Sequence, residues 1–495
     1  MTSWKRTEDL LRRPIERISF IYPPYGPVKN EPGIKAVKEN YGVFPSLSLA
    51  YVAGLAEKLG CEIQFIDANA LELPLSETIR RVRNFQPDML AFTVTTYLFY
   101  QTYLWVKALR EAVGAPTLLG GVHMGIYPEE TFSHRAIDFG CTGEAEMVLP
   151  EFLETLNRGG DLASVKGVIW RDGDQVVVNE FPDLLYDVDN VPFPARNHLP
   201  NDRYYSFISQ FRNFTPLITS RGCPFRCIFC EQGGLPFRGR KPENVVDEIE
   251  ECYHVYKVRE FDFFDSSFTV DKKRVVRICE EINRRGIHVA WAIRSRVDLV
   301  DEEMLVALRN AGCKRIYYGI ESSSPKILET LRKKTNLEQI REVMFLTRKH
   351  KIDTFGYFMV GSPGETPETI QDSIRFAIDL KLDYAQFSKV TPMPATELYR
   401  MLLNEGQPDY WRKYILDPGN EIFVPRPGCD LSEEEIQQWT RRAYIRFYFR
   451  PRYIVKALLR LKSRHELKRS VRTAWSMLTT NMSVFGRYWT KKIQY

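Results

Sequence analysis

Long hydrophobic runs are missing from this chain of 495 residues, because none approaches the roughly 20 apolar residues that a membrane-spanning helix needs. The opening residues, MTSWKRTEDLLRRP, lack the apolar core of a signal peptide, so we expect a cytoplasmic protein. Histidine occurs only 7 times and joins no serine or cysteine in a recognisable catalytic triad. The sequence therefore argues against a membrane-spanning protein and against a triad hydrolase.

Cysteine is also scarce, with 9 residues, an odd number spread over a long chain. This distribution argues against a disulfide framework and favours metal binding or reactive thiols in a reducing compartment. Hydrophobic residues make up 44% of the chain and charged residues 27%, as in soluble globular proteins. The length predicts two or three domains.

Residues 1–160 alternate strand-like and helix-like patterns. Five strand signals, the first being RISFIYPP, predict a flavodoxin-like doubly wound parallel sheet of the α/β class. The ligand of such a sheet lies beyond the carboxyl ends of its strands, where small residues let a large flat ligand approach the backbone. The candidate residues at these ends are Pro24, Thr95, Thr96, Gly120, Gly121, His123, Gly143 and Glu144.

The rest of the chain divides into three further segments. Residues 161–208 contain a predicted β-hairpin at 167–180 with an Asp-Gly turn, followed by a proline-rich linker. Residues 209–428 show six strand–helix units, which suit a partial (β/α)6 barrel of the TIM type with its chemistry at the C-terminal strand ends. Residues 429–495 are predicted to be helical.

Three of the nine cysteines gather in one loop after the first barrel strand, in SRGCPFRCIFCEQGG. Cys223, Cys227 and Cys230 have the spacing C-x3-C-x2-C. A structural zinc site needs four ligands, usually in two pairs, and no second pair lies nearby in the sequence. An iron–sulfur cube accepts three thiolates and leaves one iron open for a substrate, so the spacing favours such a cluster.

This spacing, with the aromatic Phe229 before the last cysteine, resembles the radical S-adenosylmethionine superfamily. The resemblance implies a 4Fe–4S cluster whose open iron is chelated by S-adenosylmethionine. It implies that one electron from the cluster cleaves this co-substrate to a 5′-deoxyadenosyl radical. It also implies an external one-electron reductant, a flavodoxin or a ferredoxin.

Four later segments carry the same resemblance, namely FDFFDSSFTVD, WAIRSRVD, YYGIESSS and FMVGSPGET. In the first, an acidic residue is followed by x-x-Phe, which maps onto Asp265 and Phe268. In the second, Arg294 and Arg296 lie on the same strand face, so the sequence does not separate them. The implied contacts with S-adenosylmethionine are Phe229, Asp265, Arg296, Glu321, Ser322, Gly361 and Pro363.

The first domain, with PP-x-G, GG-x-H and GE-x-E at its strand ends, resembles that of the cobalamin-binding members of this superfamily. The resemblance implies that the eight strand-end residues given above contact cobalamin. His123 lacks the aspartate of the D-x-H-x-x-G motif, so packing or hydrogen bonding is its favoured role, and cobalt ligation the alternative. Glu144 and Glu146 either take part in acid–base chemistry or stabilise the helix that they begin.

The C-terminal end is strongly basic. Residues 441–495 hold fifteen Lys and Arg against one acid, Glu466, which makes +14 in a chain whose net charge is +6. Within them, YIVKALLRLK has apolar residues at helical spacing. Such a helix either covers the barrel or lies on an anionic membrane surface, at the inner face of the membrane, and nucleic acid is the least favoured partner.

Together these features predict a cobalamin-dependent radical S-adenosylmethionine enzyme. We expect it to methylate an unactivated carbon of a hydrophobic small molecule, lipid-like or pigment-like. The alternative within the same scaffold is an anaerobic oxidative cyclase, or another non-methylating radical enzyme, of tetrapyrrole or lipid metabolism. The alternative from another class is a cobalamin or iron–sulfur sensor.

Overall fold

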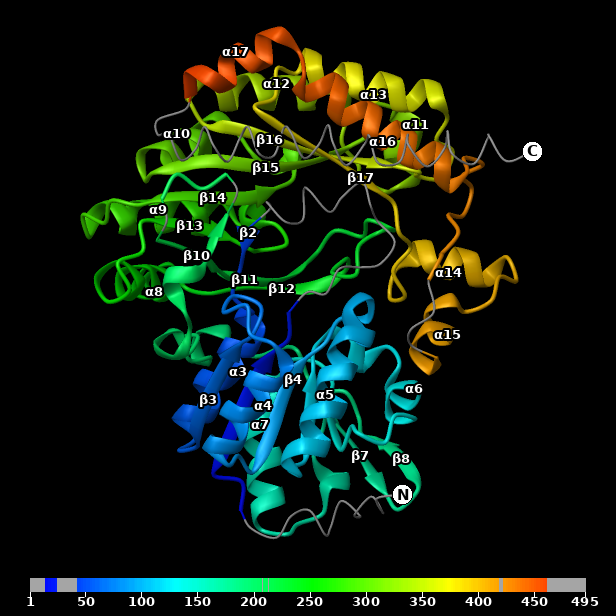
Figure 1. The fold of residues 1–495 in the computed structure, drawn as a ribbon. Helices are drawn as coiled ribbons and strands as arrows, with labels where there is room; N and C mark the ends of the chain where they lie inside the picture. Colours follow the sequence, from blue (N-terminus) through cyan, green and yellow to red (C-terminus); the bar gives the residue numbers. More distant parts are fainter. Residues whose placement is uncertain (1–13, 25–41, 207, 212, 418–421, 461–495) are drawn as a thin grey trace.

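The computed structural model describes residues 14–24, 42–206, 208–211, 213–417 and 422–460, without the side chains of 456–458 and 460. Two sheets, one mixed and one parallel, form its two halves, one above the other in Figure 1. Within the ranges given, no helix combines the length and the apolarity that crossing a membrane requires.

The first sheet contains seven strands in the order β3-β1-β4-β5-β6-β7-β8. Its first five members in this order run parallel, and β1 lies between β3 and β4, so the predicted flavodoxin-like sheet is confirmed. Both faces of β1 are buried, as expected when helices cover both sides of a parallel sheet. The elements are β1 (Arg17–Tyr22), α3 (Leu47–Lys58), β3 (Glu62–Asp67), α4 (Leu75–Phe85), β4 (Met89–Thr93), α5 (Phe99–Val113), β5 (Thr117–Gly120), α6 (Pro128–Phe132), β6 (Phe139–Cys141) and α7 (Ala145–Asn157).

The predicted hairpin consists of β7 (Val168–Asp172) and β8 (Gln175–Val178), which pair antiparallel around Gly173 at φ 60°. It extends the first sheet, because β7 pairs antiparallel with β6. The linker then follows through the short 3-10 helices η4 (Val188–Asn190), η5 (Arg196–His198) and η6 (Asn201–Arg203).

The second sheet has six parallel strands in chain order, β10-β13-β14-β15-β16-β17, which confirms the predicted partial barrel. The apolar faces of the intervening helices pack on its outer surface and form the largest core. Before β13, a two-stranded ribbon closes the cysteine loop. The elements are β10 (Phe214–Leu217), β11 (Ser220–Cys223), β12 (Leu235–Gly239), α8 (Pro242–His254), β13 (Glu260–Phe263), α9 (Lys272–Arg284), β14 (Ala290–Ser295), α10 (Glu302–Asn310), β15 (Cys313–Glu321), α11 (Pro325–Thr330), α12 (Leu337–Lys349), β16 (Asp353–Val360), α13 (Pro367–Asp379) and β17 (Tyr384–Lys389).

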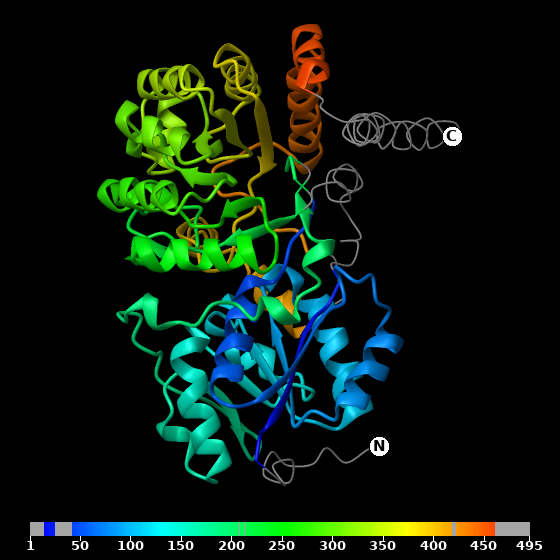
Figure 2. The same ribbon diagram turned by 90° about the vertical axis from the view of Figure 1, so that its left-hand side faces the viewer.

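The described part of the chain ends with helices that join or cover these units, α14 (Glu397–Asn404), α15 (Tyr410–Leu416), α16 (Glu433–Tyr448) and α17 (Pro451–Arg460). In Figure 2, α16 stands along the edge of the half-barrel. The backbone amides of Ala385 and Phe387 in β17 donate to the hydroxyls of Tyr448 (3.0 Å) and Tyr444 (3.3 Å). These tyrosines satisfy an edge strand that would otherwise expose its amides. Covering the barrel is therefore one role of the basic region, and residues 461–495 lie outside the described part.

Candidate active site between the two sheets

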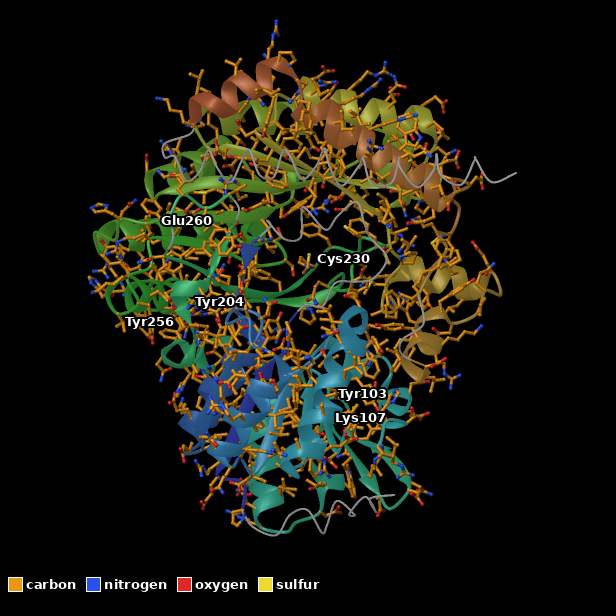
Figure 3. All side chains as sticks on the ribbon, in the orientation of Figure 1. Tyr103, Lys107, Tyr204, Cys230, Tyr256 and Glu260 are labelled. Carbon is orange, nitrogen blue, oxygen red and sulfur yellow. The ribbon has the colours of Figure 1, made fainter. Side chains whose placement is uncertain are left out.

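The cysteine loop is folded tightly by its own backbone. The Gly234 amide donates to the carbonyls of Cys223 (2.9 Å) and Phe225 (2.8 Å), and the Cys230 amide donates to the Cys227 carbonyl (3.2 Å). The three thiols form no disulfide. Figure 3 places Cys230 in the region between the barrel sheet and the first sheet. The predicted cluster ligands therefore lie together, on the side of the barrel that faces the first domain.

The surroundings of the three thiols suit an iron–sulfur cluster, in which each thiolate binds a different iron. Burial raises the pKa of Cys227, while the Lys333 and Arg296 cations act in the opposite direction. Three thiols beside two cations fit an iron–sulfur cluster, because the sulfur ligands of such a cluster are anionic and nearby cations stabilise them.

Phe229 belongs to a small apolar cluster behind the cysteine loop, with Ile228, Ile327, Leu331 and Leu398. The Ile228 amide donates to the Leu331 carbonyl (3.3 Å), and its carbonyl accepts from the Leu398 amide (2.8 Å). These bonds fasten the loop to the segments around α11 and α14. The contact of Phe229 with S-adenosylmethionine stays a prediction.

Arg294 and Arg296, which the sequence did not separate, have different partners. Arg296 donates to the Lys333 carbonyl (2.5 Å), and its Nη1 lies 3.7 Å from the Sγ of Cys227. Arg294 instead pairs with Asp262 on the neighbouring strand (2.6 Å). Arg296 is thus the one of the two that contacts the cysteine loop.

Asp265 holds the ribbon that carries the first cysteine. Its carboxylate accepts hydrogen bonds from the Thr219 amide and the Ser220 hydroxyl, each at 2.6 Å, and from the Thr219 hydroxyl. Phe268 is buried in the barrel core, where it packs against Trp291. Because the ribbon engages both carboxylate oxygens of Asp265, its contact with S-adenosylmethionine stays a prediction.

Glu321 ends β15 in a left-handed conformation, with φ 66°, and pairs with the buried Lys333 at 2.8 Å. Residue 319 is glycine for a steric reason, because a Cβ there would lie 2.5 Å from both Glu321 Oε1 and Lys333 Nζ. Ser322 is fully buried and accepts from the Ser324 amide at 3.1 Å. Lys333 was not predicted from the sequence, since nothing in LRKKTN indicates which lysine turns inward.

Gly361 and Pro363 lie in the loop after β16. The amides of Gly361, at φ 93°, and Ser362 both donate to one oxygen of Glu365, at 2.5 and 3.1 Å. The other oxygen of this buried carboxyl has no hydrogen-bond partner among the described residues. Burial raises the pKa of Glu365 to about 7. Glu365 is thus a titratable group, which the sequence did not single out, in the loop predicted to contact S-adenosylmethionine.

Pro24 and Thr95 line one cavity of about 210 Å³ at the carboxyl ends of β1 and β4. In a doubly wound sheet this is the switch point, where the ligand binds. Hydroxyl groups from Ser46, Ser48, Thr93 and Thr102 also line the cavity. The cavity thus lies where the resemblance implies cobalamin, and the contact of Pro24 and Thr95 with cobalamin stays a prediction.

The three predicted glycines differ in their surroundings. A Cβ on Gly120 would meet nothing within 4 Å, so its surface is open to a ligand. A Cβ on Gly121 would lie 2.5 Å from the Val94 carbonyl, and one on Gly143 would lie 2.6 Å from Pro182 of the linker. Close packing within the protein thus explains Gly121 and Gly143, and their contact with cobalamin stays a prediction.

His123 is fully buried, and both of its ring nitrogens are engaged. Thr131 donates its hydroxyl proton to the Tyr127 carbonyl (2.6 Å), so it must accept from His123 Nε2 (2.8 Å). Nδ1 then accepts from the Thr96 hydroxyl (3.0 Å), and burial lowers the pKa of His123 to about 3. With its one lone pair used by Thr96, the ring fits the hydrogen-bonding role, and no nitrogen is available to cobalt in this arrangement.

Glu144 connects the first domain to the ribbon of the cysteine loop. Arg221 and Arg238 lie opposite each other in the ribbon, and Glu144 accepts from both, at 2.9 and 2.6 Å. Arg221 also pairs with Glu146 at 2.5 Å. Burial acts to raise the pKa of Glu144, but Arg238 and Arg221 outweigh it and hold the pKa below its usual value. The carboxylate predicted to contact cobalamin is thus bound to the barrel.

A second contact between the domains, besides that of Glu144, involves α15. One oxygen of Asp409 accepts from the hydroxyls of Tyr127 (2.8 Å) and Tyr399 (2.7 Å). Arg412 pairs with Glu130 at 2.6 Å nearby. Tyr127 lies four residues after His123 in the chain. Its hydrogen bond to Asp409 therefore holds the segment that contains His123 against the helices that follow the barrel.

The inner wall of the half-barrel is aromatic. Tyr317 stacks on Tyr357 with ring centroids 5.9 Å apart, and Phe355 stacks on Tyr384 at 6.0 Å. These rings lie on the strand face opposite to the helix-packed core. Arg294, already neutralised by Asp262, lies over the Tyr317 ring at 4.9 Å. Such a wall suits a flat or apolar molecule.

The fold is similar to that of two solved enzymes. The radical S-adenosylmethionine methyltransferase TsrM from Kitasatospora setae, with cobalamin and a 4Fe–4S cluster bound, matches 95% of this chain and 100% of its own, with a TM-score of 0.70 and 16% identity. The cobalamin-dependent S-adenosylmethionine radical enzyme OxsB matches 94% of this chain and 72% of its own, with a TM-score of 0.64 and 18% identity. Both likenesses confirm the predicted fold class.

Sequence comparison extends the result to the family. Residues 217–377 match the profile of the radical SAM superfamily, and residues 35–153 match that of the B12 binding domain. An uncharacterized methyltransferase of Pyrococcus horikoshii, PH0819, is 33% identical over 451 residues, 89% of this chain and 94% of that protein. The anaerobic magnesium-protoporphyrin IX monomethyl ester cyclase of Cereibacter sphaeroides is 31% identical over 447 residues, 88% of this chain and 70% of the cyclase. These matches confirm the predicted cofactors as those of the family, a 4Fe–4S cluster, S-adenosylmethionine and cobalamin. The chain belongs to the cobalamin-binding enzymes of the radical S-adenosylmethionine superfamily.

Proposed function

We propose that this enzyme methylates an unactivated carbon of a hydrophobic small molecule, lipid-like or pigment-like. The observation that carries the proposal is the bond between Glu144 and Arg221. It joins the strand ends of the cobalamin-binding domain to the ribbon of the cysteine loop, which supports a cobalamin site and a cluster site that face the same space. A methyl carrier and a radical source are both needed beside one carbon for such a reaction.

Each part of the site has a role in this proposal. When bound, the cluster and S-adenosylmethionine supply a carbon-centred radical, and cobalamin supplies the methyl group. Cys223, Cys227 and Cys230 hold the cluster, and Arg296 and Lys333 balance the charge of the thiolates. The aromatic inner wall receives the substrate and excludes water from the reacting carbon. An external flavodoxin or ferredoxin is the electron source.

The products test the proposal. After anaerobic reconstitution with a candidate substrate, methylation consumes S-adenosylmethionine in two ways, so S-adenosylhomocysteine and 5′-deoxyadenosine should appear together with a product heavier by one methylene. The Cys227→Ala variant is the control that should form no 5′-deoxyadenosine. A turnover that yields 5′-deoxyadenosine without S-adenosylhomocysteine would contradict methyl transfer.

An oxidative cyclase is the second candidate, favoured by the 31% identity to the cyclase of Cereibacter sphaeroides. It abstracts hydrogen and delivers no methyl group, so only 5′-deoxyadenosine is expected. A sensor should form neither nucleoside product with any substrate. The same chromatographic assay therefore separates all three functions.

We also propose peripheral contact with a membrane through α17. Its apolar side chains Ile454, Val455 and Leu459 are 42%, 57% and 82% exposed, whereas Ile436, Ala443 and Phe447 of α16 are buried. Arg450 and Arg452 precede them, and basic residues beside apolar ones are typical of helices that lie on anionic bilayers. Such contact suits an enzyme whose substrate is lipid-like.

A further inference from the structure

The turn that follows β14 brings together two charged side chains. Arg296 precedes the 3-10 helix η8 (Val297–Leu299), whose first residue is fully buried in the barrel core. On either side of Val297 in the chain, Arg296 and Asp298 pair with each other. Nε and Nη2 of the arginine each lie 2.9 Å from one oxygen of the Asp298 carboxylate. A pair with two bonds fixes the plane of the guanidinium as well as its position, so Asp298 decides which way Arg296 faces.

The third nitrogen of this guanidinium faces the cysteine loop. Nη1 forms neither bond to Asp298 and lies 3.7 Å from the Sγ of Cys227, and Nη2 also donates to the Lys333 carbonyl at 2.5 Å. The guanidinium carbon lies 4.0 Å from the centre of the Phe225 ring, which belongs to the same loop as Cys227. Four of the five N–H donors of Arg296 therefore have partners, and the side chain is held with one N–H directed at the sulfur.

The charge around this sulfur is balanced locally. The two cations that act on the Cys227 thiol are Lys333 and Arg296. Lys333 is bound by the carboxylate of Glu321 at 2.8 Å. Arg296 is bound by Asp298 at 2.9 Å, and it turns Nη1 toward the sulfur and its other edge toward the carboxylate. The thiol therefore meets the positive ends of two ion pairs that together carry no net charge.

Such surroundings have a defined effect on an iron–sulfur cluster. The reduction potential of a cluster depends on the net charge nearby and on hydrogen bonds to its sulfurs. Reduction adds negative charge, so the cation and the N–H of Arg296 favour the reduced form, and the carboxylate of Asp298 opposes it. Residues behind a metal ligand also fix the orientation of that ligand. The pair thus supplies a directed hydrogen bond to the thiolate without an excess of positive charge.

We propose that Arg296 and Asp298 form a positioning pair for the Cys227 thiolate, and that Asp298 keeps the potential of the cluster low by neutralising Arg296. The inference goes beyond the proposed function, because it concerns the predicted cluster and not the carbon on which the enzyme acts. In the step that the pair affects, one electron passes from the external carrier to the cluster, and no bond of either side chain forms or breaks. Arg296 keeps its proton, since a guanidinium is always charged in proteins.

The midpoint potential of the cluster tests the proposal. It is measured by redox titration with electron paramagnetic resonance on reconstituted full-length enzyme without S-adenosylmethionine. Asp298→Asn leaves Arg296 without its counter-charge, so one-electron reduction should become roughly tenfold more favourable, an upward shift of about 59 mV. Arg296→Gln removes the N–H and the cation but leaves Asp298, so the potential should fall by a similar amount. The double variant is again neutral, and its potential should lie between those of the single variants.

Asp174→Asn is the matched control. It breaks the pair of Asp174 with Arg135, which is also 2.9 Å long but lies at the hairpin of the first domain, and it should leave the potential unchanged. Opposite shifts in the two single variants are a readout that a merely structural role would not give, because looser packing admits water to the cluster in both. Shifts in the same direction, or no shift in either variant, would overturn the proposal.

Iron per chain is measured alongside, and Asp298→Glu serves as the conservative variant. It keeps the charge of the pair and should retain the iron and a potential near that of the wild type. Iron lost from Asp298→Asn but kept in Asp298→Glu would support the pair, because the two variants differ in charge. Iron lost from both would show a structural role only and overturn the proposal. If Arg296→Gln holds no iron, the potential of Asp298→Asn against that of Asp298→Glu decides. The proposed function fails differently, through the absence of S-adenosylhomocysteine after turnover by an enzyme whose potentials are as expected.

Discussion

Glu144 lies at the N-terminus of the last helix of the cobalamin-binding domain, 2.9 Å from Arg221, which stands two residues before the first cysteine of the other domain. The carboxylate also bonds Arg238, which faces Arg221 across the ribbon. Two adjacent, largely buried cations would repel each other without it. The contact between the domains is therefore part of what allows the ribbon to fold.

Replacing Glu144 by Gln should loosen this junction. Arg238 would lose its carboxylate partner while buried, and Arg221 would keep only Glu146, so we expect the free energy of unfolding to fall by about 2 kcal/mol or more. Hydrogen exchange at residues 220–223 and 235–239 should accelerate. Glu154→Gln, which breaks an exposed pair with Arg158, is the control and should change stability by less than about 0.5 kcal/mol. Unchanged exchange in the ribbon would contradict this account.

The Cys227→Ala variant should not retain the cluster. Two thiolates in a half-buried loop cannot hold a cube that needs three, so iron per chain and the brown absorbance should both fall to background. Cys61→Ala is the matched control, because Cys61 is a half-buried thiol outside the loop. Full iron content in the Cys227 variant would refute the cluster assignment.

His123→Gln should leave the electron paramagnetic resonance spectrum of bound cob(II)alamin unchanged. The wild-type ring has no lone pair left for cobalt, because Thr96 uses Nδ1 and Nε2 donates to Thr131. Stability should fall by about 1–3 kcal/mol, since a buried hydrogen-bond network is disturbed. A nitrogen hyperfine splitting that disappears in this variant, and persists in His134→Gln, would show that His123 ligates cobalt.

Glu365→Gln should change how stability depends on pH. Its pKa is raised from 4.5 to about 7, so the native state holds this proton more tightly than the unfolded state. The resulting stabilisation is complete below pH 4.5 and is lost as the pH rises through 7, about 3 kcal/mol in all. Denaturation at pH 5 and pH 8 should therefore show a smaller loss of stability in the variant than in the wild type. The exposed Glu111→Gln should behave like the wild type, and an identical loss in all three proteins would disprove the assignment.

Replacing Ile454, Val455 and Leu459 together by Glu should weaken binding to vesicles that contain anionic lipid. The variant removes exposed apolar area and adds charge that the bilayer repels. Co-sedimentation of full-length protein with the vesicles measures the effect. Leu185→Glu, at a linker side chain that is 72% exposed, is the control and should sediment as the wild type does. Equal sedimentation of all three proteins would end the membrane proposal.

Much of the fold could be predicted because its signals are local. Alternating apolar runs and helical stretches indicated both parallel sheets, and an Asp-Gly turn indicated the hairpin at 167–180. The hairpin's pairing with β6 was not predicted, since it depends on an exposed sheet edge that only the assembled domain has. The contact of Tyr444 and Tyr448 with β17 could likewise not be predicted, because their hydroxyls bond a strand that lies about sixty residues earlier in the chain.

The candidate site likewise has features that could be predicted from the sequence and features that could not. The spacing of Cys223, Cys227 and Cys230 was sufficient to predict an open cluster, because three thiolates in one short loop cannot be far apart. The distinction between Arg294 and Arg296 was not available, because the sequence does not show that the strand ends at Ser295 and that Arg296 lies beyond it, beside Cys227. Lys333 was missed for a related reason, since the strained backbone on either side decides that it turns inward.

By itself, then, the sequence determined which cofactors the chain is predicted to bind. The predicted cluster ligands, strand ends and glycine loops each depend on residues that are close together in the chain. Only the tertiary structure decided how the two domains that carry the predicted cofactor sites meet. Glu144 and Arg221 are 77 residues apart, and Tyr127 and Asp409 are 282 apart. Partners so distant leave no periodicity or spacing to read, and charge and hydrogen bonding select them only once both sheets have folded.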